Sequence, residues 1–136
     1  MRLVTLLFSA AVLASGVGIA AAEDTTPAAC KNEHSGMAMG SGMGAMDTSG
    51  MTDMQKAYMA GMDKMHPAMA AGVMAADPDV AFVCGMIPHH QGAIDMAKVA
   101  LQYGKDPWVK QLAQNIIDAQ TKEIADMTKW LDEHGK

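Results

Sequence analysis

Two Asp-Pro pairs, Asp77-Pro78 and Asp106-Pro107, constrain the fold of this chain more than any other feature of its sequence. An aspartate can cap the free N–H groups at a helix start, and proline at the first helical position sacrifices no hydrogen bond. Each pair therefore predicts a helix, one from Pro78 to about Tyr103 and one from Pro107 to about His134. Gly104 lies between them, where a helix is expected to end.

A further helix is predicted upstream, capped by Thr52 or Asp53. Its apolar residues recur at steps of three and four: Met54, Tyr58, Met62, Met65, Met69 and Val73. The last helix has an apolar face of Trp108, Val109, Leu112, Ile116, Ile124, Met127 and Leu131. Pro67 and Pro88 fall inside helical patterns and predict kinks or a break. With no strand pattern, residues 51–136 are expected to form an all-α, antiparallel bundle of three main helices, which dimerisation could complete as a four-helix bundle.

The region before this domain divides into two segments. Residues 1–22 have a short positive start, an apolar run and small residues before Glu23, which predicts a signal peptide cleaved after Ala22 and a periplasmic or secreted location. Residues 23–50 are rich in Met, Gly and Ser and are expected to be a disordered tail. The tail also carries a predicted flexible metal-binding set: His34, Met37, Met39, Met43 and Met46.

Composition excludes some partners. The chain has a formal net charge of -5 and no clusters of Lys and Arg, so nucleic acid is not an expected partner. No membrane contact is expected after signal cleavage. The chain also has 15 methionines and two cysteines. Cys30 and Cys84 could pair within the chain or between chains, and the sequence leaves this open.

The stretch MIPHHQGAID, Met86 to Asp95, carries the most unusual chemistry. On a helical wheel, Met86, His89, His90 and Met96 fall on one stripe, which we expect to be buried together with Phe82 and Val83. Cys84 and Asp95 point away from that stripe. The first helix repeats the pattern, because Met62, Met65, His66 and Met69 share a sector of about 100 degrees.

The last helix places polar residues in or beside its apolar stripe: Gln120 and Glu123, with Met127 nearby. Burial of an unpaired carboxylate is costly, so Glu123 needs a partner. A histidine N–H is the natural candidate. Glu123 would then orient a histidine, with Gln120 and Met127 as further surrounding residues.

Thioether and imidazole groups together favour a soft metal ion. Thioether sulfur binds Cu(I), and by the same softness Ag(I), without losing a proton. Zinc is a poorer match, because it favours cysteine, histidine and carboxylate ligands. The residues therefore indicate copper, with Cu(I) favoured.

Three segments together resemble the DUF305 family, a domain of unknown function. They are MDKMHPAM (62–69), MIPHHQGAIDMA (86–97) and AQTKEIADMTKWL (119–131). The resemblance implies a ferritin-like helical bundle and, from some members, periplasmic copper or silver binding. By position it implies these metal ligands: Met62, Met65, His66, Met69, Met86, His89, His90 and Met96. Pro67 and Cys84 depart from the family pattern.

The function predicted from these features is non-enzymatic: periplasmic binding of Cu(I) or Ag(I) for copper sequestration, transfer or resistance, with a copper-transfer protein and a homodimer as candidate partners. Three alternatives stay open. The bundle could bind haem b through one Met and one His, or the Met stripe could be an adaptable surface for a protein partner. A copper oxidase is the third. A di-iron enzyme is excluded, because it needs several inward carboxylates.

Overall fold

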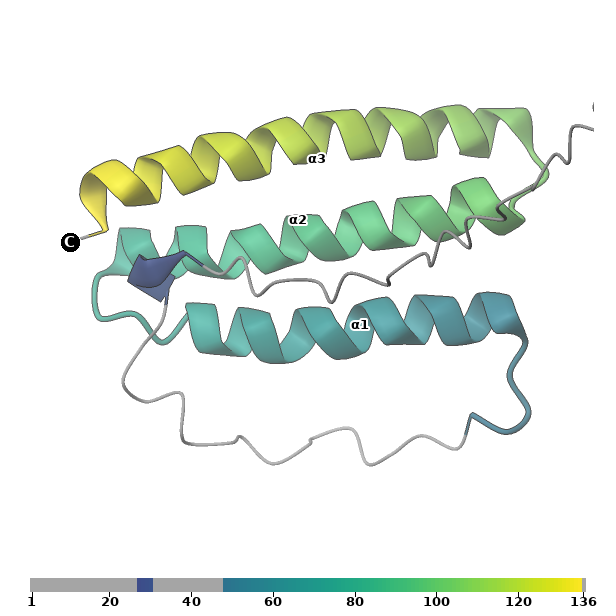
Figure 1. Cartoon of the computed structure of the whole chain (residues 1–136), viewed down its shortest axis with the longest axis horizontal. Coiled ribbons are helices and arrows are strands. Elements are labelled where there is room, and N and C mark those ends of the chain that lie inside the picture. The colour runs from purple at the N-terminus through teal and green to yellow at the C-terminus, as the bar shows by residue number, and fades with distance from the viewer. Residues whose placement is uncertain (1–26, 31–47, 136) are drawn as a thin grey trace, which may run out of the picture.

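The computed structural model of the chain describes residues 27–30 and 48–135 (Figure 1). Its elements are a short 3-10 turn η1 (Ala28–Cys30) and three α-helices, α1 (Asp53–Gly72), α2 (Pro78–Tyr103) and α3 (Pro107–His134). These residues contain no strand, so the predicted all-α fold is confirmed. The predicted signal peptide and the five predicted metal-binding residues of the tail lie outside the described residues.

The helix starts are those that the sequence predicts. The Thr52 hydroxyl accepts from the backbone N–H of Gln55, whose side chain in turn accepts from the backbone N–H of Thr52. Asp77 caps α2 by accepting from the N–H groups of Asp79 and Val80. Asp106 caps α3 by accepting from Val109. These side chains satisfy N–H groups that a helix start leaves without partners, and so they fix where each helix begins.

Neither internal proline interrupts its helix. α1 continues through Pro67 and α2 through Pro88, which excludes the break that the sequence allowed. Each proline lacks an N–H and cannot donate to the carbonyl four residues earlier, which is that of Asp63 in α1 and that of Cys84 in α2.

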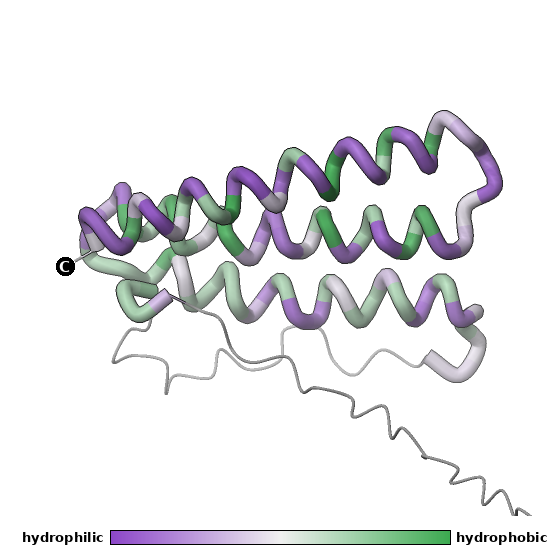
Figure 2. The backbone as a smooth tube through the Cα atoms, turned by 45° about the horizontal axis from the view of Figure 1, so that its top comes forward, coloured by the Kyte–Doolittle hydropathy of each residue, from purple (hydrophilic) through white to green (hydrophobic). Residues whose placement is uncertain are grey.

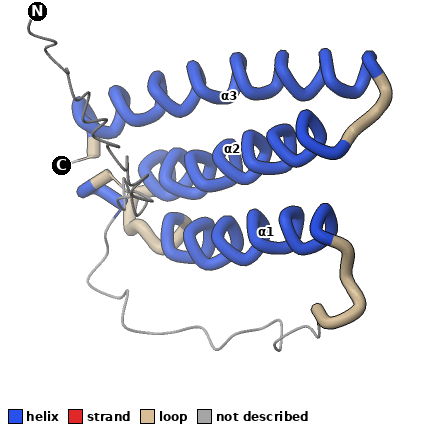
Figure 3. Tube along the Cα trace, turned by 45° about the vertical axis from the view of Figure 1, so that its right-hand side comes forward, coloured by secondary structure: helices blue, strands red, loops and turns tan. Residues whose placement is uncertain are grey.

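The three helices form one layer with α2 in the middle (Figures 1 and 3). α2 packs antiparallel against α1 on one side and α3 on the other, whereas α1 and α3 hardly touch. α3 alternates between strongly hydrophobic and strongly hydrophilic positions, as expected for a helix with one packed side (Figure 2). Because α2 has neighbours on two opposite sides, two broad faces of the layer remain.

Glycines bring α1 and α2 close together. A Cβ atom added at Gly72 would collide with the backbone carbonyl of Cys84, and one at Gly92 would collide with the Sδ atom of Met65. A Cβ atom at Gly85 would lie 2.8 Å from the Cγ1 atom of Val73. At Gly72 the obstacle is rigid backbone, so a larger residue would push the two helices apart, whereas at Gly92 and Gly85 the side chain of Met65 or Val73 would have to move.

A disulfide joins Cys30 to Cys84 and fastens η1 to α2. Both cysteines are buried, and with Leu131 they form the core cluster, against which Val80 and Ile87 also pack. Two expectations are therefore wrong. Residues 27–30 of the predicted disordered tail are folded, and Cys84 points into the core.

We expect Gly72→Ala to destabilise the protein by about 1–3 kcal/mol, because the added methyl group meets the rigid backbone of α2. This loss should appear although alanine is the better helix former by about 1 kcal/mol. Urea denaturation followed by circular dichroism measures the change.

Gly61→Ala in the same helix is the matched control, because its Cβ atom would lie an ordinary 3.5 Å from the Cβ atom of Asp95. It is expected to be neutral or mildly stabilising. Equal stability changes in the two variants would contradict the glycine-mediated contact.

Candidate functional site

The two faces of the layer differ in what lies on them. One face, called here the disulfide face, holds a cavity of about 380 Å³ next to η1. Its lining residues come from every helix and from η1: Pro27, Cys30, Ala68, Ala71, Gly72, Cys84, Ile87, Pro88, Gln91, Ile124 and Thr128. The opposite side of the layer is called the open face.

On α2, helical geometry assigns the methionine and histidine stripe to the open face. Measured from Cys84, the α1-contacting Gly92 lies at about +80 degrees and the α3-contacting His90 at about -120 degrees. The stripe between these two directions is centred at about 180 degrees, directly opposite the cavity. It consists of Phe82, Met86, His89, Ala93 and Met96.

Around the axis of α1, Met62 and Met69 lie about 40–60 degrees from Met65. They lie on the side of Met65 that faces away from Ala68, which lines the cavity, and so they belong to the open face. Both side chains are half-buried. Met65 differs, because its sulfur lies against Gly92 in the contact between the helices. His66 is exposed at the outer edge of the face. The predicted methionines therefore divide into one packing residue and a set that borders the open face.

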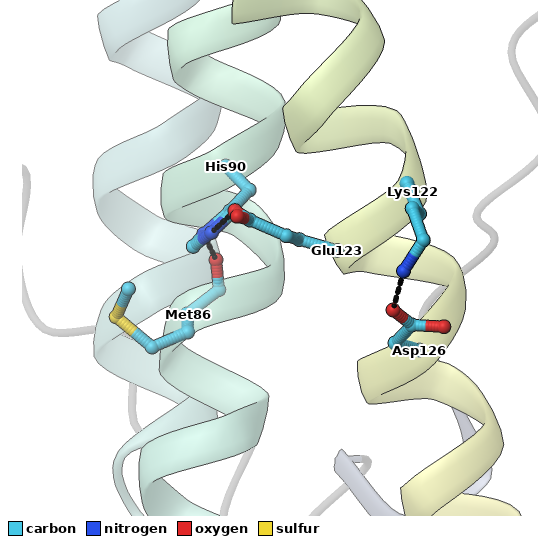
Figure 4. Close-up of polar contacts among 5 residues, drawn as sticks. All are labelled: Met86, His90, Lys122, Glu123 and Asp126. Carbon is cyan, nitrogen blue, oxygen red and sulfur yellow. Dashed lines mark hydrogen bonds and ion pairs between the residues drawn. The ribbon is translucent and has the colours of Figure 1, made fainter.

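His90 is held by two hydrogen bonds. Its Nδ1 atom lies 2.8 Å from the Met86 carbonyl oxygen, and its Nε2 atom lies 2.8 Å from Oε2 of Glu123 (Figure 4). A carbonyl only accepts, so Nδ1 must carry a proton and donate. The side chain of His90 is 12% exposed and that of Glu123 is 55% exposed. The expected histidine partner of Glu123 is therefore found, and both ring nitrogens of His90 are engaged.

His89 stands in contrast to its neighbour. It is exposed, it points toward the open face about 100 degrees around the helix from His90, and its ring lies edge-on to that of His90 at 5.9 Å. Of the two adjacent histidines, His89 is the one that an incoming ligand can reach without breaking the Glu123 contact.

Two further residues of α3 lie one turn on either side of Glu123. Gln120 is half-buried, and its Oε1 atom is the one buried side-chain N or O atom without a hydrogen-bond partner in the described part of the chain. Met127 is half-buried.

Asp126, nearby on α3, accepts a hydrogen bond from Lys122 at 2.7 Å, and this contact raises the pKa of the exposed Lys122 ammonium (Figure 4).

The structure corrects the expected burial of the stripe. Phe82 is 65% exposed and Met96 is 42% exposed, so the methionine and histidine residues border an uncovered surface. On α3, Trp108, Val109 and Leu112 are also exposed, which contradicts their expected place in a packed face. No group of three or more His, Cys, Asp and Glu side chains gathers anywhere in residues 27–30 and 48–135. A site on these helices would thus depend on thioether sulfur.

Sequence reasoning missed two features of the site. Phe82 and Leu112 were assigned to packed surfaces, although they flank the open face. The cavity beside the disulfide was also missed, since it depends on pairing Cys30 with Cys84, which the sequence left open. The presence of two cysteines in a chain with a predicted signal peptide was the signal that could have indicated it.

These observations define a single layer of three helices, one face of which carries methionine and histidine side chains. Residues 12–131 match the family described as a domain of unknown function (DUF305), and the chain belongs to that family. It is also 49% identical over 55 residues to the uncharacterized protein L153 of Acanthamoeba polyphaga mimivirus, a stretch covering 40% of this chain and 36% of that protein. The matched stretch therefore spans about a third of that relative's length.

We expect His90 to react with diethyl pyrocarbonate several-fold more slowly than His66 and His89, because its ring nitrogens are engaged and its side chain is largely covered. Glu123→Ala should accelerate the reaction at His90 and leave that at His66 unchanged. Peptide mass spectrometry gives the rate at each histidine.

Glu133→Ala is the control, because Glu133 is an exposed carboxylate on the same helix whose ion-pair partner is Lys129. It should leave the rate at His90 unchanged. Equal rates at His89 and His90 in the unaltered protein would contradict the assignment of roles.

Proposed function

We propose that this protein binds Cu(I) or Ag(I) through the methionine and histidine side chains of the open face, and acts in copper sequestration or transfer. The observation that carries the proposal is the placement of thioethers from two helices on one face of the layer, which also carries an exposed histidine. Met62 and Met69 contribute from α1, and Met86 and Met96 contribute from α2, the helix that carries His89. The metal ion is cargo in this proposal, and no reaction is assigned to the protein.

The ligand chemistry supports a soft monovalent ion. Thioethers are uncharged, so they can hold Cu(I) or Ag(I) without an anionic ligand and without releasing protons. Divalent calcium and magnesium ions need several oxygen ligands, which this face does not supply. One imidazole from His89 adds a nitrogen ligand that suits copper in either oxidation state.

His90 takes a supporting role in the proposal. Its Nε2 atom can reach a metal ion only after Glu123 has moved away. The Glu123–His90–Met86 contact ties α3 to the middle of α2 and fixes the turn that carries His89. The proposal therefore leaves His90 out of the set of metal ligands that the family resemblance implies.

Exposure of the face supports transfer as well as storage. Met methyl groups and sulfur atoms at a partly exposed surface can exchange an ion with another protein without unfolding. The disulfide between Cys30 and Cys84 is consistent with the proposed oxidising location outside the cytoplasm. Among the helices of the described residues, none has the length and apolar character needed to cross a membrane.

A competition titration against a chromophoric Cu(I) chelator, under anaerobic reducing conditions, tests the proposal. We expect the double variant Met86→Leu with Met96→Leu to bind Cu(I) at least about tenfold more weakly, because thioether ligands are removed along the whole α2 stripe at nearly constant side-chain volume. Ag(I) should show the same order of affinities.

The control is Met54→Leu with Met74→Leu, which changes two exposed methionines away from the open-face stripe. It should bind as the unaltered protein does. A third variant with Met37, Met39, Met43 and Met46 changed to leucine separates the contribution of residues 31–47. Undetectable binding by the unaltered protein would overturn the proposal, and loss of binding in the third variant alone would move the site off the helices.

A further inference from the structure

We infer that the open face is the contact surface of a homodimer, in which a second copy of this chain covers it. The inference goes beyond metal binding and does not require it, because the face is apolar whether or not a metal ion is present. The first observation that supports the dimer is that the helices form a single layer. Folded domains normally have two or more layers around a core, and this chain supplies one across the described residues.

Large exposed apolar side chains of α2 and α3 lie on the open side of the layer. On the disulfide face, η1 covers one end of α2, and the other end carries the polar side chains of Gln91, Lys98 and Gln102. On the open face, Phe82 is 65% exposed and Leu112 of α3 is 41% exposed. Leu112 lies on the same side of α3 as Glu123, which marks the open face through its contact with His90. Large exposed side chains thus flank the methionine and histidine stripe along two helices.

The size of the face matches a stable dimer. α1 has 20 residues, which makes it about 30 Å long. Three helices spaced 8–10 Å apart make a layer about 25–30 Å wide. The face therefore covers roughly 800 Å², which is about the surface that each partner buries in a stable protein complex.

Charge permits a copy of the same chain as the occupant at this face. The chain has a net charge of -5, so two copies repel each other at most orientations. The open-face stripes of α1 and α2 contain no Asp, Glu, Lys or Arg, and the carboxylate of Glu123 on α3 is already paired with His90. Two copies can therefore meet across the α1 and α2 stripes without placing like charges opposite each other.

The position of α2 determines what the dimer brings together. Because α2 is the middle helix, a two-fold axis lying between the layers sets the α2 stripe of one copy against the same stripe of the other. Met86, His89 and Met96 of both copies would then line one shared contact. This part of the inference rests on the proposed metal function, and it assigns the metal ion a site with ligands from both chains.

Sedimentation velocity of the full chain, processed by its expression host and kept in a metal chelator, tests the dimer without involving metal. We expect a dimer at micromolar concentration, and mostly monomer after Phe82→Glu or Leu112→Glu. Both substitutions are at exposed positions, and circular dichroism must show unchanged helix content. Gln102→Glu is the matched control, because it adds the same charge to α2 on the opposite face and should leave the dimer intact.

A monomer in the unaltered protein at these concentrations would overturn the inference and leave the face for a different protein. A dimer that survives both open-face variants would overturn it as well, because the contact would lie elsewhere. If the dimer forms and Cu(I) binding is undetectable, the inference stands and the metal proposal fails. If the protein is a monomer and its open-face methionines bind Cu(I), the metal proposal stands and the dimer inference fails.

Discussion

The close contact between α1 and α2 is the constraint on which the rest of the structure depends. Gly72, Gly85 and Gly92 let α1 approach the backbone of α2, and the disulfide fixes η1 to the same helix on the opposite side from the methionine stripe. With α3 on the other flank, α2 is held from two directions and cannot turn its stripe inward. The methionines of α1 and α2 therefore end on one surface, where they can act as metal ligands and as an apolar contact.

The adjacent histidines show how one turn of helix can serve two purposes. A step of about 100 degrees separates their side chains. His90 turns toward α3 and is fixed by Glu123 and by the Met86 carbonyl, whereas His89 turns toward the open face. A fixed imidazole beside a free one suits a metal-binding surface, because the first holds the geometry while the second stays accessible. The proposed function and the proposed dimer both use this arrangement.

Local signals predicted the helices, and only tertiary structure decided which faces are buried. Asp77, Asp106 and Thr52 act as caps within one turn of sequence, so their positions could be predicted from chemistry alone. The contact of Glu123 with a histidine followed from the cost of an unpaired carboxylate near an apolar stripe. On the helical wheel, Cys84 was predicted to point away from the core, because the methionine stripe was taken as the buried side of the helix. A helix with two neighbours is covered on two opposite sides, and its own periodicity does not show where those neighbours lie.

The central claim is that the methionine thioethers of the open face bind the metal ion. A methyl NMR spectrum of protein carrying ¹³C-labelled methionine methyl groups, titrated with Ag(I), tests it at each residue. The methyl signals of Met62, Met69, Met86 and Met96 should move together, while that of Met65, which packs on Gly92, and that of Met74 should stay in place. Shifts confined to Met37, Met39, Met43 and Met46 would contradict the claim, because the ion would then bind outside the helices.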